Sequence, residues 1–270
     1  SITVFGSTVY KNTYHGIKYK NINISKKIFG LGSQTLKYIS EFSKLEHKKP
    51  SDIIEIHNRP IYVQRLPLND TKIILYFHND PLSMNGSKNK EERIKLLELC
   101  SKIVFNSQWS KDRFLSGIDE IYVKSTKLIV IRQSTEPQKV NINDKEKIIT
   151  FVGKLNKAKG YDVFGSAIIE ILNKFKDWKA IVIGDEKREK IILSHKRASI
   201  LGFKKHNEVI NIFKKTSITV APSRWDEPFG RTSLEASANG CAVIITNKGG
   251  LPETVTDAKI LEKLNEKNLT

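Results

Sequence analysis

The 270-residue sequence is poor in cysteine and proline and contains no long hydrophobic run. Its two cysteines, Cys100 and Cys241, allow one disulfide at most, which excludes a disulfide-stapled scaffold and favours a reducing compartment. Eight prolines and 15 glycines exclude collagen-like and low-complexity chains. No window approaches about 18 apolar residues, so no transmembrane helix is predicted. The first residues, SITVFGS, lack the features of a signal peptide, and we expect a cytoplasmic protein.

Positive charge dominates the composition. There are 46 Lys and Arg against 29 Asp and Glu, a formal net charge of +17. AT-rich coding, which favours Lys, Ile and Asn, explains this excess without any function. The functional explanations are peripheral contact with an anionic membrane at the inner face, or an acidic or phosphorylated substrate. The basic residues are spread along the chain without a like-charge block, so nucleic acid is not the expected partner.

The apolar residues predict two α/β domains. About 150 residues per domain is usual, which favours two domains for this length. Short β-branched runs alternate with polar helical stretches, as in buried parallel sheets with right-handed helical crossovers. The predicted strands are Ile2–Phe5, Ile53–Ile56, Ile73–Phe77, Ile103–Phe105, Leu128–Ile131, Ile148–Val152, Ala180–Ile183, Ser217–Ala221 and Ala242–Thr246.

Helices are predicted between these runs, and a polar gap divides the chain. Apolar residues recur at helical spacing in Gln34–Lys48, Glu91–Lys102 and Val163–Phe175. The gap TEPQKVNINDKEK at Thr135–Lys147 has no apolar stripe, so we place the domain boundary between residues 1–138 and 139–270. Each half is Rossmann-like by pattern, which predicts a cleft with ligands beyond the carboxyl ends of the strands.

The segment PSRWDEPFGRTSLEASA at Pro222–Ala238 carries the strongest candidate site. A strand precedes a loop that contains Glu227, and a helix that contains Glu235 follows. A carboxylate such as Glu235 can accept hydrogen bonds from two vicinal ribose hydroxyls. Free N–H groups at the start of the helix suit a phosphate: Gly230, Arg231 and Thr232. The same spacing also fits a plain strand–loop–helix connection with a capping carboxylate.

A second candidate segment, FVGKLNKAKGYD at Phe151–Asp162, opens the second half. Its strand ends at Gly153, and Lys154 and Lys159 follow before the next helix. Two lysines at the carboxyl end of a strand can neutralise a diphosphate as point charges. In a lysine-rich chain they also fit a solvated loop.

Three motifs together resemble a known family. VGKLNKAKG, EPFGRTSLEASANG and GGLPE follow one another as in the C-terminal domain of retaining GT-B glycosyltransferases of family 4, the glycosyl transferases group 1. The segments ILYFHNDP, CSKIVFNSQWSKDRFL and KLIVIRQSTE in the first half also resemble this family. The resemblance implies an α/β protein of GT-B architecture, with an acceptor-side domain at 1–138 and a nucleotide-sugar domain at 139–270.

The family's donor is a nucleotide-diphosphate sugar, here with UDP or GDP as the expected nucleotide. The resemblance places Lys154 and Lys159 on the diphosphate, and Gly153 is also expected to bind the nucleotide sugar. The distal phosphate would be bound by the backbone at Phe229, Gly230, Arg231 and Thr232.

Glu227 and Glu235 resemble the family's E-x7-E pair, and the resemblance gives Glu235 to the ribose and Glu227 to the donor sugar. His78 would lie near the reacting carbon, so His78 and Glu227 are the expected catalytic residues. The implied reaction transfers a hexose, with retention, to a glycan, a lipid-linked glycan or a lipopolysaccharide core. Two cations and a helix N-terminus can stabilise the leaving diphosphate, so neither metal nor cofactor is expected. The sequence also has no Asp-x-Asp motif and no zinc-ligand spacing.

The family usually has one more strand and a glycine-rich loop before the part that matches Ser1, and it continues beyond GGLPE. We therefore expect a chain truncated at both ends. An alternative is a catalytically inactive module that still binds a nucleotide sugar. A charge-driven nucleic-acid binder and a GT-B phosphorylase are less favoured.

Overall fold

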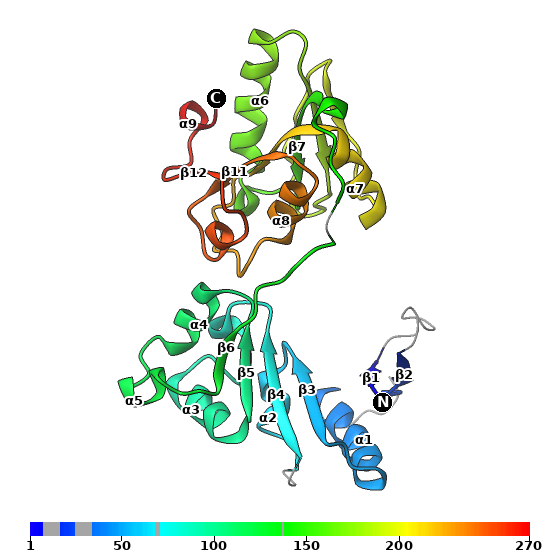
Figure 1. Ribbon diagram of the computed structural model, residues 1–270, viewed down its shortest axis with the longest axis vertical. Coiled ribbons are helices and arrows are strands. Elements are labelled where there is room, and N and C mark those ends of the chain that lie inside the picture. Colours follow the sequence, from blue (N-terminus) through cyan, green and yellow to red (C-terminus); the bar gives the residue numbers. More distant parts are fainter. Residues whose placement is uncertain (8–16, 25–33, 68–70, 137) are drawn as a thin grey trace. The chain divides into compact units, whose positions relative to one another are not determined.

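The computed structural model describes residues 1–7, 17–24, 34–67, 71–136 and 138–270, which form two compact units (Figure 1). Unit 1 comprises Ser1–Phe77, Pro81–Val104 and Phe114–Ile129. Unit 2 comprises His78–Asp80, Phe105–Arg113 and Val130–Thr270. Of the helices in these ranges, none is long and apolar enough to cross a membrane.

A four-stranded sheet in the order β3-β4-β5-β6 forms the centre of the first half. Its strands are β3 (Ile53–His57), β4 (Lys72–Phe77), β5 (Lys102–Phe105) and β6 (Leu128–Val130). Its helices are α1 (Gln34–Lys48), α2 (Pro60–Val63), α3 (Lys90–Leu99), α4 (Gln108–Leu115) and α5 (Glu120–Val123), with a 3-10 turn at Pro81–Ser83. β3 and β4 run parallel, as predicted.

The first strand departs from expectation. β1 (Thr3–Gly6) pairs in parallel with β2 (Lys18–Asn21), which was not predicted, in a separate two-stranded sheet. All four residues of β1 are only half-buried. The expectation that Ile2–Phe5 is buried on both faces of a larger sheet is therefore wrong, because a four-residue apolar run does not reveal which strand it pairs with.

Unit 2 contains a six-stranded sheet in the order β12-β11-β10-β7-β8-β9, and every neighbouring pair is parallel. The strands are β7 (Glu146–Val152), β8 (Lys179–Ile183), β9 (Ala198–Ile200), β10 (Thr216–Ala221), β11 (Ala242–Thr246) and β12 (Lys259–Leu261). The strand order proceeds from β7 through β8 to β9 on one side, and from β10 to β12 on the other. The β7–β10 pair is thus a topological switch point, beside which open α/β sheets bind their ligands.

Helices cover both faces of this sheet (Figure 1). α6 (Tyr161–Lys174) and α9 (Glu266–Leu269) pack on one face, and α7 (His206–Lys215) and α8 (Arg231–Ala238) on the other. Alternation along β11 sends Val243 and Ile245 to the second face, while Ile244 packs on the first. Burial of both faces explains why these strands appear as near-continuous apolar runs.

Along the chain, the predicted boundary after Gln138 falls between the last strand of the first sheet and the first strand of the second. β6 ends at Val130, and β7 begins at Glu146. The division at this residue stays a prediction, since unit 2 also takes two short segments from the first half. A 3-10 turn at Ile142–Asp144 precedes β7.

Both cysteine thiols are expected to be unreactive in the native protein. Cys100 and Cys241 are buried and form no disulfide. Burial raises the pKa of Cys100 to about 12 and also raises the pKa of Cys241. Because the thiolate is the nucleophile, we expect almost no reaction with Ellman's reagent at about pH 8, and release of both thiols on unfolding in urea. Rapid labelling of either thiol in the folded chain would contradict this burial.

Candidate active site

Two loops converge at the carboxyl ends of β7 and β10. β7 leads into the 3-10 turn η3 (Lys157–Lys159), and β10 leads into the loop before α8. The backbone N–H groups of Arg224 and Trp225 both donate to the carbonyl oxygen of Ala158, at 2.9 and 3.1 Å. These hydrogen bonds join the two loops into one rim.

An ion pair and a close backbone approach reinforce the rim. The Arg224 guanidinium donates to both carboxylate oxygens of Asp162, at 2.6 and 2.9 Å. Burial alone would raise the pKa of Asp162, but the bonds from Arg224 hold it below its usual range. Gly160 has φ 71°, and a Cβ there would lie 1.9 Å from the Pro222 carbonyl oxygen. Only glycine fits this approach.

Glu227 is held from several directions on this rim. Lys159 Nζ forms an ion pair with Glu227 Oε1, and Ser223 Oγ donates to the same oxygen at 2.9 Å. The Glu227 carbonyl accepts from the Gly250 N–H at 2.6 Å. The side chains of Glu227 and Lys159 are 14% and 31% exposed, so this pair is less screened than a surface ion pair. The structure thus pairs two residues that the sequence assigns to different parts of a donor.

The N-terminus of α8 adds a second positive feature. Gly230 precedes this helix with φ 108°, in the left-handed region. Its own N–H and those of Arg231 and Thr232 meet no acceptor in the part of the chain that the structure describes. A cavity at this position is lined by, among others, Phe229, Gly230, Arg231, Thr232, Gly153, Lys159, Ser223 and Glu227. Free N–H groups and the helix dipole suit an anion in this cavity.

Glu235 lies on α8 and is only 8% exposed. Arg231 Nη2 donates to its Oε1 at 3.0 Å, and His206 Nδ1 lies 3.9 Å from its Oε2. The sequence reasoning missed both partners. The four-residue spacing of Arg231 and Glu235 on a helix could have revealed one of them. No sequence pattern predicts the proximity of His206, because α7 and α8 are separate along the chain and come together only in the folded structure.

The two remaining candidates, Lys154 and His78, lie differently with respect to this cavity. Lys154 is exposed, and it is not among the residues that line the cavity. His78 follows β4 directly, is half-buried and lines the same cavity. The Asn106 side-chain amide donates to its carbonyl oxygen at 3.0 Å, and Gln133 Nε2 lies 3.4 Å from its Nδ1. The roles assigned to Lys154 and His78 stay predictions.

No group of three or more potential metal-binding side chains (His, Cys, Asp or Glu) occurs within the described residues. The sequence also predicts that donor binding does not require a metal ion, and this stays a prediction.

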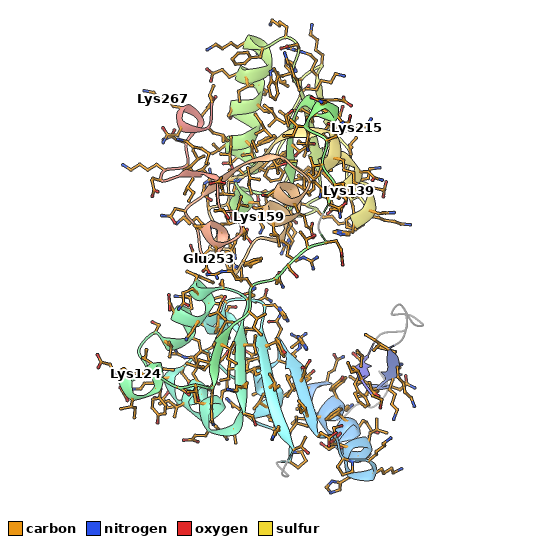
Figure 2. The ribbon with its side chains drawn as sticks, viewed as in Figure 1. Lys124, Lys139, Lys159, Lys215, Glu253 and Lys267 are labelled. Atoms are coloured by element: carbon orange, nitrogen blue, oxygen red, sulfur yellow. The ribbon has the colours of Figure 1, made fainter. Side chains whose placement is uncertain are left out.

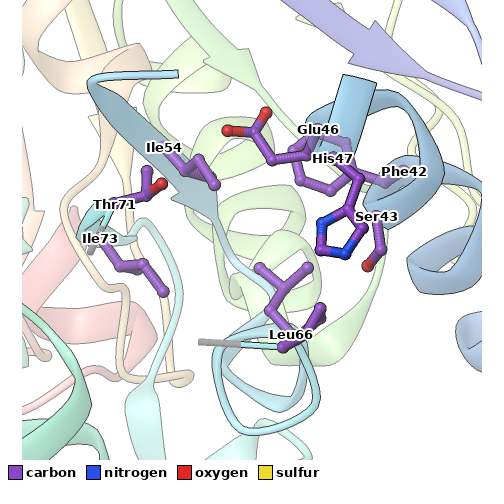
Figure 3. Close-up of a pocket in the computed structure, with 9 residues that line it drawn as sticks. Phe42, Ser43, Glu46, His47, Ile54, Leu66, Thr71 and Ile73 are labelled. Atoms are coloured by element: carbon purple, nitrogen blue, oxygen red, sulfur yellow. The ribbon is translucent and has the colours of Figure 1, made fainter. Parts of the chain in front are cut away.

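A smaller hollow lies in unit 1, between α1 and the strands β3 and β4 (Figure 3). Glu46 accepts a hydrogen bond from Ser51 Oγ at 3.0 Å and another from the Ser51 N–H, so its carboxylate is already occupied. Most of the remaining lining is apolar, including Phe42, Ile54, Leu66 and Ile73. The hollow therefore lacks the convergent charges of the β7–β10 site.

The fold of the chain is similar to that of solved glycosyltransferase structures. The sheets are parallel, and the solved structures that the chain resembles are GT-B glycosyltransferases. One is a glycosyltransferase from Rickettsia africae ESF-5 (TM-score 0.70, 21% identity, 94% of this chain and 73% of that chain). Another is Alr3699/HepE of Anabaena in complex with UDP and glucose (TM-score 0.66, 17% identity, 94% and 75%). These likenesses establish an α/β fold of the GT-B class.

The family follows from the sequence match. The family model for glycosyl transferases group 1 matches residues 132–268, just over half of the chain, and the chain belongs to this family. YtcC of Bacillus subtilis is 28% identical over 235 residues, which cover 76% of this chain and 57% of YtcC. The chain thus spans less than two thirds of that relative.

Substitution of Gly249 tests how tightly the Glu227 backbone is held. Gly249 has φ 60°, and a Cβ there would lie 2.2 Å from the Glu227 carbonyl oxygen. Gly202 has a similar φ of 66°, but a Cβ there would meet nothing within 4 Å. We expect Gly202→Ala to lower the free energy of unfolding in urea by about 1–2 kcal/mol, the cost of the left-handed backbone alone. Gly249→Ala should cost clearly more, and equal losses would contradict the close approach.

Proposed function

We propose that this chain binds a nucleotide-diphosphate sugar at the β7–β10 switch point and transfers the sugar to an acceptor, as a retaining hexosyltransferase. One observation carries the proposal: Lys159, Glu227 and the unpaired N-terminus of α8 lie around one cavity. A cation and free N–H groups suit a diphosphate, and a nearby carboxylate suits sugar hydroxyls. Membership of the glycosyl transferases group 1 supports this assignment.

The reaction needs stabilisation of a leaving group. When the bond from the anomeric carbon to the phosphate oxygen breaks, its electron pair stays on the diphosphate. Lys159 and the N–H groups of Gly230, Arg231 and Thr232 then offset the developing charge, and preplaced charge of this kind is usually the largest catalytic contribution. We propose that the acceptor hydroxyl attacks from the same face and that its proton passes to the leaving phosphate, which retains the configuration.

The other candidate residues complete this proposal. Glu235 accepts hydrogen bonds from the ribose hydroxyls, and Arg231 holds its carboxylate for this role. Glu227 accepts from the donor sugar, Lys154 contributes to the diphosphate, and His78 lies near the reacting carbon. The acceptor is a glycan, a lipid-linked glycan or a lipopolysaccharide core, reached in the cytoplasm with peripheral membrane contact. UDP is the first nucleotide to test, because HepE was crystallised with UDP and glucose, and GDP is the second.

Binding of nucleoside diphosphates tests the site. UDP, GDP and ADP are titrated by calorimetry, each in Mg²⁺ and in EDTA, into the wild-type chain and into Lys159→Ala and Glu235→Ala. Lys267→Ala is the matched control, because Lys267 is an exposed lysine on α9 (Figure 2). We expect one nucleotide to bind equally well in EDTA, and about tenfold or more weaker in both site variants, the cost of a charged hydrogen bond. Lys267→Ala should bind as the wild type does.

Other outcomes contradict particular parts of the proposal. Binding that requires Mg²⁺ contradicts metal independence. A chain that is folded by circular dichroism but binds none of the three nucleotides contradicts the donor site itself. Binding of the nucleotide sugar without transfer to any acceptor favours the inactive binding module.

A further inference from the structure

We propose that Ser223 is a positioning residue whose hydroxyl orients the Glu227 carboxylate toward the donor sugar. The inference rests on the proposed function, since Glu227 has a sugar to bind only if the donor binds here. It adds a residue that neither the motifs nor the comparisons assign to this site.

The backbone of Ser223 is fixed. Ser223 is the second residue after β10, behind Pro222, and is 3% exposed. Its carbonyl oxygen accepts from Thr246 Oγ1 at 2.6 Å, and Thr246 is the last residue of the adjacent strand β11. The next two N–H groups along the chain are bound to Ala158. The hydroxyl of Ser223 therefore stands at a defined place on the rim.

The single hydroxyl proton of Ser223 has three acceptors within reach. They are Glu227 Oε1 at 2.9 Å, the Trp225 carbonyl oxygen at 2.9 Å and the Ala158 carbonyl oxygen at 3.3 Å. The Ala158 oxygen already accepts two backbone N–H groups. A hydrogen bond to an ionised acceptor is roughly twice as strong as one to a neutral acceptor, so the proton points to Glu227.

Lys159 also binds Glu227 Oε1, but under the proposed function its ammonium group binds the diphosphate as well. When a diphosphate enters the cavity, the positive charge of Lys159 is shared between the phosphate and Glu227. The hydroxyl of Ser223 is neutral and is not drawn away by the incoming charge. It therefore keeps Oε1 in place, and Oε2, to which no side chain of the described residues donates, stays open for a sugar hydroxyl.

The matched variants are Ser223→Ala and Thr216→Val. Both remove one buried hydroxyl, but only the first touches Glu227. Thr216 is the first residue of β10, and its hydroxyl donates to the Ile212 carbonyl oxygen. Affinities are measured for UDP with UDP-glucose, and for GDP with GDP-mannose. For the pair that the wild type binds, we expect Ser223→Ala to keep its affinity for the free diphosphate and to lose about tenfold for the nucleotide sugar. Thr216→Val should change the two affinities by the same factor, whatever its effect on the melting temperature.

A measurement without ligand separates this inference from the proposed function. The urea midpoints of Ser223→Ala, Glu227→Ala and the double variant form a cycle, and direct contact predicts that the two losses are not additive. Additive losses of stability would overturn the positioning role. Equal effects of Ser223→Ala on the affinities for the diphosphate and for the nucleotide sugar would also overturn it. Non-additive losses in a chain that binds no nucleotide confirm the contact but overturn the proposed function, and the positioning role with it.

Discussion

The parallel pairing of β7 with β10 is the constraint on which the site depends. The two strands lie side by side although two other strands and two helices separate them along the chain. A buried hydrogen bond of 2.9 Å between the hydroxyls of Thr150 and Thr219 joins them within the sheet. Since parallel strands end at the same edge, the loops after β7 and β10 must meet. Lys159 and Glu227 come together for this reason.

The charges on this edge are arranged before any ligand is present. Lys159 and Glu227 neutralise each other, and Arg231 lies against Glu235. A partly buried charge without a partner would cost several kcal/mol, so mutual pairing lets these groups stay ionised. A donor that brings two phosphates and several hydroxyls offers each of these groups an alternative partner. The pairing that stabilises these charged groups therefore also suits a ligand of mixed charge and polarity.

The sequence predicted most of the fold because its elements are long or strongly apolar. α1 spans Gln34–Lys48, the predicted range, and the predicted strands of the two larger sheets all exist. The strands β2, β9 and β12 were missed because they have only three or four residues and are largely exposed, so they carry no apolar run. The short length of β1 likewise concealed its true partner.

The sequence predicted only those features of the site that lie within a single segment of the chain. The N-terminus of α8 and the position of Glu235 could be read from residues close in sequence. The Lys159–Glu227 pair could not, because it depends on the order of the strands. Ser223 and Glu227 are only four residues apart in the sequence. Their contact could still not be predicted, because the path of the loop decides which acceptor the Ser223 hydroxyl meets.

The proposed donor site depends most on binding of the phosphates by the free N-terminus of α8. The most direct measurement follows the backbone amide signals of the protein by ¹H–¹⁵N NMR while UDP or GDP is added in EDTA. If the phosphates bind at α8, the signals of Gly230, Arg231 and Thr232 shift first and furthest, because their N–H groups gain an anionic acceptor. Saturable shifts confined to other parts of the chain, or no shifts at all in the folded protein, would contradict it.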